Sequence, residues 1–332
     1  MIGVSVIVCC YNSSNRLSAT IEHLANQKVP AGILWEIVIV DNNSTDDTKE
    51  RAAVEWRKYN STVSFRVVVE QSPGLSAARE KGIEEALYDY LIFCDDDNWL
   101  DCNYVNKVFE LLKAHPQVAV VGGNNVAVFE TAPPAWISFF QHSYAIGNQG
   151  EGTFEILEGN RYIVGAGMAF KKAAYLDIKR KAFNFYLTDR IGNKVVGGGD
   201  VELCFIFKLA GYKIAYSAEL ILQHYMPSVR ITKKYLTNMW HQYAPSWLVF
   251  EAYKTVLICA GKETITERYW KELARQAIAD EVKFLPQYMY SKLRGDVAYY
   301  LPHETKFIYN YYLLRNARSI VRMILEIQSK IR

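Results

Sequence analysis

The sequence predicts an α/β fold, with a mostly parallel sheet flanked by helices and a helical C-terminal appendage. Short β-branched runs alternate with helical patterns from Met1 to about Gly123, as in parallel sheets covered on both faces. Beyond Lys233 strand signals become rare, and helical runs such as Thr264–Lys283 replace them. We therefore expect one domain over residues 1–230, with halves at 1–123 and 124–230, and a helical region over residues 231–332.

Length and composition allow a large core. The chain has 332 residues, of which 50% are hydrophobic, so it can bury a sizeable core and carry an appendage. A net charge of only +3 gives no indication of nucleic-acid binding. The six cysteines include no Cys-x-x-Cys pair, and several fall in apolar patterns, where a thiol behaves as a small hydrophobic group. These features predict a cytoplasmic protein.

We expect neither a leader nor a membrane-spanning segment. The N-terminus runs directly into a strand pattern, without the basic region of a signal peptide. The longest apolar stretch near the C-terminus, Trp247–Ala260, contains Glu251 and Lys254. It is also shorter than the roughly twenty residues that a bilayer requires.

The last helical pattern, about Thr305–Gln328, mixes apolar and basic residues. An amphipathic basic helix can lie on an anionic membrane surface, here the inner face of the membrane. An ordinary helix packed on its own domain has the same periodicity, and we favour that interpretation. Peripheral membrane contact through this helix is the alternative.

The first elements are a strand over Val4–Val8 and a helix in which Leu17, Ile21 and Leu24 recur at helical spacing. Short polar residues between the two can satisfy the free N–H groups at the start of the helix. The candidates for this N-cap are Asn12, Ser13 and Ser14.

Acidic residues follow the next strands that we expect to be buried. The strand Glu36–Val40 ends at Asp41, and the strand Tyr90–Cys94 ends at the run Asp95–Asp97. In open α/β sheets ligands bind beyond the carboxyl ends of the strands. The two acidic strand ends therefore predict one shared pocket.

The middle of the chain is less regular. A helix is predicted over Asp101–Ala114, the pattern stops near Thr131–Ala135, and a loop-rich section continues to about Asn160. A second ordered block then begins with Tyr162–Phe170, passes the turn Gly197–Gly199 into a helix from Asp200, and ends near His224.

In order and spacing, these segments resemble the family 2 glycosyltransferases, which are nucleotide-sugar enzymes of the GT-A fold. The resemblance covers roughly the first two thirds of the chain. Five stretches carry it: Val4–Asn12, Val38–Thr48, Gly74–Gly82, Leu91–Trp99 and Gly197–Leu203.

The resemblance implies an inverting, metal-dependent transfer of one sugar from a nucleotide sugar, with a UDP-linked donor favoured. The acceptor would be a hydroxyl of a glycan or lipid-linked molecule in polysaccharide or glycoconjugate biosynthesis, bound on the side of residues 124–230. A processive synthase of this family would carry a Gln-x-x-Arg-Trp stretch, whereas His241–Trp247 has no arginine. The competing interpretation is a catalytically silent nucleotide- or carbohydrate-binding protein with the same fold.

A divalent cation can neutralise the charge on a departing diphosphate, and carboxylate oxygen suits Mn²⁺ or Mg²⁺. By resemblance, Asp97 would bind this metal directly. Asp95 would lie nearer the ribose or a metal-bound water, and Asp96 would belong to the nucleotide site. His224 is a further candidate ligand, although a lone histidine is more often structural.

The resemblance assigns Asp41 to the imide N–H of a base such as uracil, Tyr11 to stacking on the base, and Arg79 to the base or the phosphates. Asp41 can equally serve a turn or a helix cap, and Arg79 alone would be read as a surface residue. The neighbouring Cys10 and Asn12 complete the predicted nucleotide-binding set.

Asp200 is the candidate general base that removes the proton of the acceptor hydroxyl. The family usually has Glu-Asp here, whereas this chain has Gly199 before Asp200, so Glu202 is a reserve candidate. The alternative for Asp200 is an N-cap of the following helix.

Four residues are predicted to contact the acceptor or the sugar. Trp99 can stack on a sugar face, although core packing is also expected of such a residue. Glycines let the backbone approach a ligand closely, but they also simply make turns. The glycines in question are Gly165, Gly167 and Gly199.

Overall fold

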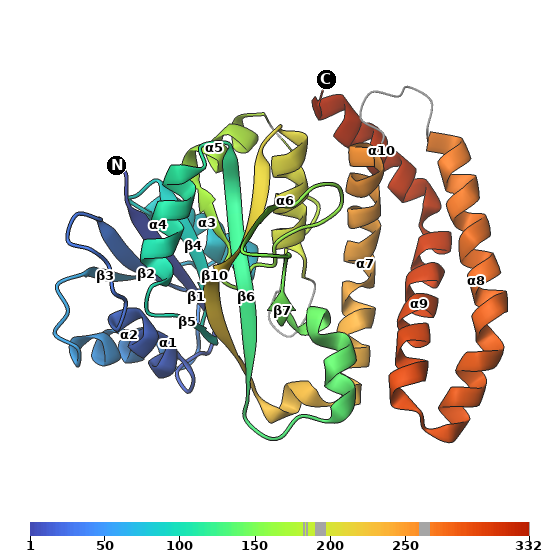
Figure 1. The fold of residues 1–332 in the computed structure, drawn as a ribbon, viewed down its shortest axis with the longest axis horizontal. Coiled ribbons are helices and arrows are strands. Elements are labelled where there is room, and N and C mark those ends of the chain that lie inside the picture. The colour runs from blue at the N-terminus through green and yellow to red at the C-terminus, as the bar shows by residue number, and fades with distance from the viewer. Residues whose placement is uncertain (182, 184, 190–196, 259–265, 332) are drawn as a thin grey trace.

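The computed structural model describes residues 1–181, 183, 185–189, 197–258 and 266–331, and over these residues the strands form one sheet. Figure 1 shows this sheet and its covering helices with a group of C-terminal helices at one flank. The strands are β1 (Val4–Cys10), β2 (Trp35–Asp41), β3 (Ser64–Val69), β4 (Tyr90–Asp95), β5 (Asn98–Leu100), β6 (Val118–Phe129), β7 (Gly147–Asn148), β8 (Phe154–Ile156), β9 (Ala169–Lys171) and β10 (Lys213–Met226).

The helices fall into two groups along the chain. The first group, with two 3₁₀ helices, is α1 (Leu17–Ala25), α2 (Thr48–Arg57), α3 (Leu75–Glu85), α4 (Tyr104–Ala114), η1 (Ala135–Tyr144), α5 (Lys172–Arg180), α6 (Gly199–Leu209) and η2 (Ser228–Ile231). The second group is α7 (Lys233–Ile258), α8 (Thr266–Arg294), α9 (Val297–Arg315) and α10 (Ala317–Ile331).

The strand order is β3-β2-β1-β4-β9-β6-β10-β5, with β7 beside β6 and β8 beside β10. The strands β1 to β4 run parallel, as do β6 and β10. Short antiparallel β9 joins these two halves. Helices cover both faces, so the predicted mostly parallel α/β sheet with C-terminal helices is confirmed.

The first unit forms as its sequence predicts, except at the helix cap. Leu17, Ile21 and Leu24 are fully buried on one face of α1. The residue at the N-cap position is Arg16, and no side chain caps the helix. The predicted cap is therefore wrong, because the Ser13 side chain bonds the backbone N–H of Tyr11 and the Asp96 carboxylate instead.

The parallel register brings the acidic strand ends together. Cys10 at the end of β1 pairs with Asp41 at the end of β2, and Cys9 pairs with Asp95 at the end of β4. Chain segments that follow these three strands therefore leave the sheet at the same edge, as the shared-pocket prediction requires.

A second pairing brings His224 to the same edge. The short strand β5 follows the acidic run directly and pairs antiparallel with β10, with Asn98 opposite His224. Asp97, one residue earlier, consequently faces His224 although the two are far apart in the sequence.

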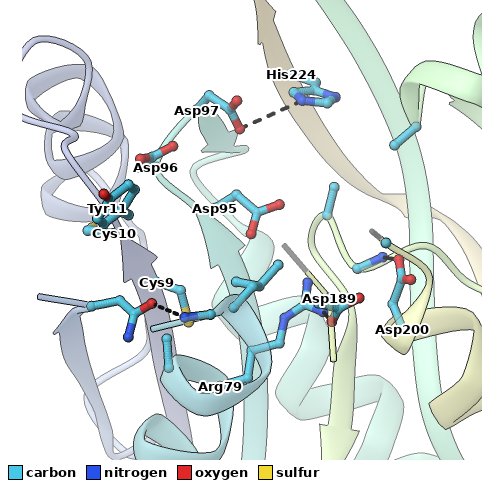
Figure 2. Close-up of a pocket in the computed structure, with 18 of the residues that line it drawn as sticks. Cys9, Cys10, Tyr11, Arg79, Asp95, Asp96, Asp97, Asp189, Asp200 and His224 are labelled. Atoms are coloured by element: carbon cyan, nitrogen blue, oxygen red, sulfur yellow. Dashed lines mark hydrogen bonds and ion pairs between the residues drawn. The ribbon is translucent and has the colours of Figure 1, made fainter. Parts of the chain in front are cut away.

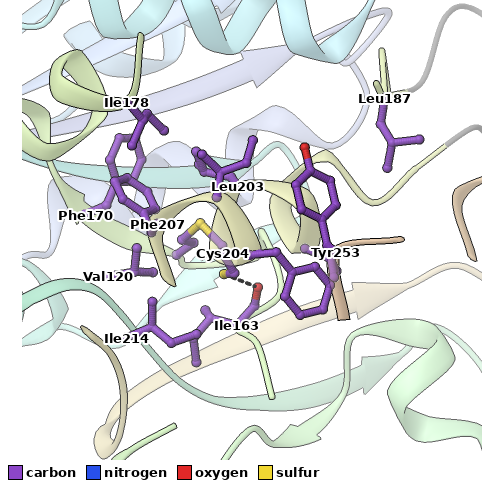
Figure 3. Packing of buried hydrophobic residues seen from close by; sticks show 14 of the residues in the cluster. Val120, Ile163, Phe170, Ile178, Leu187, Leu203, Cys204, Phe207, Ile214 and Tyr253 are labelled. Atoms are coloured by element: carbon purple, nitrogen blue, oxygen red, sulfur yellow. Dashed lines mark hydrogen bonds between the residues drawn. The ribbon is translucent and has the colours of Figure 1, made fainter. Parts of the chain in front are cut away.

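The largest apolar cluster continues from the sheet into the C-terminal helices. Tyr253 of α7 stacks on Phe205 of α6, with ring centroids 6.1 Å apart. Figure 3 shows Tyr253 in this cluster together with Cys204 of α6 and Ile163. Apolar residues of α10 belong to the same cluster. The predicted boundary near residue 230 falls just before α7, but the core runs across it, so α7 is part of the packing of the sheet domain.

The C-terminal helices differ from the predicted ranges. The predicted helix Thr264–Lys283 is α8, which extends to Arg294, while positions 264 and 265 lie outside the described residues. The predicted helix Thr305–Gln328 is wrong, since Asn316 separates α9 from α10. The Asn316 amide donates to the Tyr312 carbonyl at 2.8 Å, which satisfies one of the free carbonyls at the end of α9.

The amphipathic face of α10 is already covered. Ile320, Ile324 and Ile327 are buried in the main cluster, so this face packs on the protein, as the favoured interpretation expects. Among the described helices, none is long and apolar enough to cross a membrane.

Candidate functional site

A cavity of about 520 Å³ opens at the edge of the sheet where β1, β2 and β4 end (Figure 2). Its size lies within the usual range of small-molecule sites. Segments from several elements form its walls: the β1–α1 loop, the start of α3, the acidic run after β4, the start of α6, η1 and α7. Predicted site residues that line it are Cys10, Tyr11, Arg79, Asp95, Asp96, Asp97, Gly165, Asp200 and His224.

Asp96 stabilises the loop on which Tyr11 lies. Arg16 Nη2 is 2.8 Å from its Oδ2, and the Ser13 hydroxyl donates to the same oxygen. Burial, together with the negative charge of Asp97, raises the pKa of Asp96. This carboxylate lines the cavity, but it is already bound by Arg16 and Ser13.

Asp97 is held from two sides. Arg230, which follows β10 in η2, lies 2.8 Å from Oδ2, and the Asn98 amide donates to Oδ1 at 3.1 Å. His224 Nε2 is 3.7 Å from Oδ1, which is too long for a hydrogen bond. The other ring nitrogen, Nδ1, is buried with no hydrogen-bond partner among the described residues.

Asp97 and His224 fit a metal site whose remaining ligands would come from the substrate. Within the described ranges no group of three or more histidine, cysteine or acidic side chains is arranged to hold a metal ion. Mg²⁺ in phosphate-transferring sites is usually held by one or two carboxylates plus substrate phosphates. The Asp97 carboxylate and the His224 Nε2 that faces it meet that smaller requirement.

Asp41 and Asn12 lie beside the cavity rather than in its lining. The Asp41 carboxylate is buried and accepts the Ser44 N–H at 3.2 Å. The Asn12 side chain accepts the Thr45 N–H at 2.8 Å, so it ties the loop after β1 to the loop after β2. The turn role considered for Asp41 is therefore present, and its role toward a base stays a prediction.

Arg79 reaches the cavity from the second turn of α3. Its guanidinium lies 3.1 Å from Asp189 and 4.9 Å above the Phe93 ring. A Cβ at Gly165 would approach Arg79 Nη2 to 2.5 Å, so only glycine lets the arginine lie there. The reading of Arg79 as a surface residue is wrong, because its side chain is only 11% exposed.

Asp200 faces the cavity from the first turn of α6. Its carboxylate accepts the N–H groups of Gly165 and Val201. Burial raises its pKa, which the positive charge of Arg79 partly opposes. The N-cap of α6 is Gly198, so Asp200 does not cap this helix and its carboxylate remains at the cavity wall.

The structure contradicts the reserve role of Glu202. This carboxylate is fully buried and is not part of the cavity lining. It accepts the N–H groups of Tyr186 and Leu187, at 2.7 and 3.0 Å, and the Tyr253 hydroxyl at 3.0 Å. Glu202 therefore connects α6 to α7 and to Tyr186 and Leu187, which precede α6. Its carboxylate cannot reach a substrate hydroxyl.

We expect Glu202→Gln to reduce the free energy of unfolding by about 1–3 kcal/mol, because an amide cannot accept all three hydrogen bonds. Burial raises the pKa of Glu202 from 4.5 to about 7. The folded state therefore binds this proton more tightly, and the contribution of Glu202 to stability falls as pH rises between these two values. Glu202→Gln should lack this pH dependence of the free energy of unfolding.

Urea unfolding of wild type and Glu202→Gln at about pH 5 and about pH 8 measures the difference. The wild type should lose more stability than the variant over this interval. If the stability of both proteins depended on pH to the same extent, the raised pKa assigned to Glu202 would be contradicted.

Three other predicted residues lie outside the cavity lining. Trp99 stacks between His23 and Tyr225, with ring centroids 5.6 Å away on each side, so the packing role also expected of it is present and its contact with sugar stays a prediction. Gly167 has φ +74° and accepts the Tyr104 hydroxyl, which makes it a turn residue. Gly199 lies between two lining residues, Gly198 and Asp200, and its N–H donates to Asp189.

Sequence reasoning missed several polar residues of the cavity, among them Asn42, Asp189 and Arg230. Asn42 accepts the Gly74 N–H at 2.7 Å and thereby places the start of α3. Asp189 pairs with Arg79, and Arg230 pairs with Asp97. Of these only Asn42 lies in a predicted motif stretch, so only it carried a local signal.

The sheet and its acidic cavity define a class of protein: an α/β protein with carboxylates at the edge of the sheet where its parallel strands end. The glycosyl transferase family 2 profile matches residues 5–178, just over half of the 332 residues. The chain belongs to glycosyl transferase family 2, and its sheet with flanking helices is of the GT-A type.

Curated relatives match different portions of the chain. It is 32% identical over 128 residues to the putative glycosyltransferase EpsH of Bacillus subtilis, a match covering 39% of this chain and 35% of EpsH. It is 23% identical over 252 residues to the glucosyl-dolichyl phosphate glucuronosyltransferase of Haloferax volcanii, covering 73% of this chain and 75% of that protein. The chain thus spans about a third of the length of EpsH.

Among solved structures, TarS 1-349 of S. aureus in complex with UDP-GlcNAc superposes with a TM-score of 0.56. The match covers 99% of this chain and 91% of the TarS chain, at 16% identity. This likeness shows that the two share a fold, including the C-terminal helices.

Proposed function

We propose that the protein is an inverting glycosyltransferase that uses a divalent metal and a UDP-linked sugar. The observation that carries this proposal is the placement of Asp97 with His224 and of Asp200 with Arg79 in one cavity. The TarS complex holds UDP-GlcNAc, which supports a UDP-sugar as donor for a protein of the same fold.

The donor is proposed to bind along the ends of β1, β2 and β4. Tyr11, which is 44% exposed at the cavity, would stack on the base. Asp41 would accept the imide N–H of uracil, and Asp95 would bind the ribose or a metal-bound water. Arg79 would contact the phosphates, where its fixed guanidinium offers several donors.

Asp97 and His224 would hold Mn²⁺ or Mg²⁺ together with diphosphate oxygens of the donor. Enzymes of this family typically use a divalent metal. When bound, the cation neutralises charge on the diphosphate as it leaves. Arg230 fixes the Asp97 carboxylate for this task.

Asp200 is proposed to accept the proton of the acceptor hydroxyl. The hydroxyl oxygen forms the new bond to the anomeric carbon, and the bond from that carbon to the diphosphate oxygen breaks, with its electron pair leaving on the diphosphate. A base pKa raised by burial suits this role, since the carboxylate then binds a proton more readily.

The acceptor would enter from the side of η1 and α7. Here the cavity is lined by Tyr144, Tyr235 and Tyr243, and the rings of Tyr144 and Tyr235 stack with centroids 6.4 Å apart. Aromatic faces and hydroxyls suit the rings of a glycan, whether free or lipid-linked. Residues 124–230 would thus form only part of the acceptor side, and α7 would complete it.

A donor panel tests this function. We expect Mn²⁺-dependent release of UDP from one or more UDP-sugars and no comparable release from GDP- or dTDP-sugars. Asp47→Asn, which changes an exposed carboxylate away from the cavity, should behave as wild type. UDP binding without turnover of any donor, even with glycan acceptors present, would instead favour the catalytically silent binding protein.

A further inference from the structure

A buried carboxylate occupies the space beside Gly199. Asp189 is 3% exposed, and its Oδ1 accepts the Gly199 N–H at 2.7 Å. A Cβ built on Gly199 would lie 2.8 Å from the carboxyl carbon of Asp189, closer than real Cβ atoms come to a neighbour. Position 199 can therefore carry no side chain while Asp189 is in place.

The Asp189 carboxylate joins two elements, α3 and the first turn of α6. Its Oδ2 lies 3.1 Å from Arg79 Nη1 and 3.4 Å from the Ser76 hydroxyl, both on α3. Its Oδ1 holds the first turn of α6 through Gly199. Because Asp200 is the next residue of that turn, one carboxylate fixes both Arg79 and the element that carries the proposed base.

Arg79 has more than one acidic neighbour. Its guanidinium interacts with the charges of Asp95, Asp189 and Asp200, and the interaction with Asp189 is the strongest. Asp189 takes an ion pair with Arg79 at 3.1 Å, whereas the Asp200 carboxylate accepts the backbone N–H groups of Gly165 and Val201. A carboxylate paired directly with a guanidinium is a weaker base, so this division of partners leaves Asp200 better able to accept a proton.

We propose that Asp189 is a positioning residue whose carboxylate, lying against Gly199, holds the Arg79 guanidinium and sets the first turn of α6. The inference rests on the proposed glycosyl transfer.

Moving the carboxylate tests the proposal. The variants are Asp189→Gly, Gly199→Asp and the double variant, compared with wild type and with the surface control Asp47→Asn. Glycine suits position 189, whose φ is +56°. Each single change should lower kcat by about tenfold or more, since one removes the carboxylate and the other crowds it. The double variant should regain at least about tenfold over either single variant.

Independent losses that multiply in the double variant would overturn the proposal, and so would full activity of Asp189→Gly. Asp189→Asn keeps the shape of the side chain and the backbone conformation, and it is the test variant if Asp189→Gly does not fold. It should fold and show a reduced kcat with UDP affinity less affected, because the amide carries no charge for Arg79; full activity would again overturn the proposal.

Urea unfolding of wild type, the two single variants and the double variant separates this proposal from the proposed function. If wild type turns over no donor, the proposed glycosyl transfer is wrong. Recovery of stability in the double variant would still show that side chains at positions 189 and 199 compete for the same space. No recovery of either stability or turnover would contradict the inference itself.

Discussion

Asp200→Asn is expected to lower kcat by roughly 10²–10⁴-fold while the affinity for UDP stays within about threefold of wild type. The amide keeps the size of the side chain and can still accept one of the two N–H groups that Asp200 now binds. It cannot accept the proton of an acceptor hydroxyl at neutral pH. The loss should therefore appear in the chemical step and not in donor binding.

Transfer rates and UDP titrations on the same preparations measure this separation. Asp47→Asn provides the matched control, because it makes the same chemical change at an exposed position outside the cavity. If Asp200→Asn retained wild-type kcat, the assignment of the base would have to be abandoned. Glu202 would not replace it, since its carboxylate is enclosed by α6 and α7.

Asp97→Asn is expected to raise the Mn²⁺ concentration needed for half-maximal turnover by at least roughly 10–100-fold. Loss of a residue that only supports a metal ligand typically lowers metal affinity or activity by about that factor. Asp97 is proposed to be a ligand itself. The change also leaves Arg230 without its carboxylate partner, so the local positive charge rises as the metal site weakens.

Turnover measured over a range of Mn²⁺ concentrations checks this expectation, with circular dichroism confirming that the variant is folded. Arg230→Gln is a useful comparison, since it removes the neighbouring charge but keeps Asp97. An unchanged Mn²⁺ requirement in Asp97→Asn would show that the metal, if used, is held elsewhere.

Local patterns predicted the sheet and its acidic edge. A buried parallel strand is a short apolar run, and the residue after it lies at the ligand edge of the sheet, so Asp95 and Asp97 could be placed from neighbours in sequence alone. The same reasoning placed Asp200 at the start of a helix.

Contacts between distant segments could not be predicted in this way. Arg79 and Asp189 are 110 residues apart, and Asp97 and Arg230 are 133 apart. The segment that carries Asp189 has no periodic pattern to reveal its position. The ring partners of Trp99 could not be predicted either, because its neighbour in sequence is the acidic run, whereas the pleat of β5 turns its ring toward His23 and Tyr225.

The central claim is that the acidic edge of the sheet binds a nucleoside diphosphate through a divalent metal. Isothermal titration of UDP into the purified protein, with and without Mn²⁺ and in parallel with GDP and dTDP, tests it most directly. We predict binding of UDP that depends on Mn²⁺ and is lost in Asp97→Asn. Absence of binding by any of the three nucleotides to folded protein, or equal UDP affinity without metal, would contradict the claim.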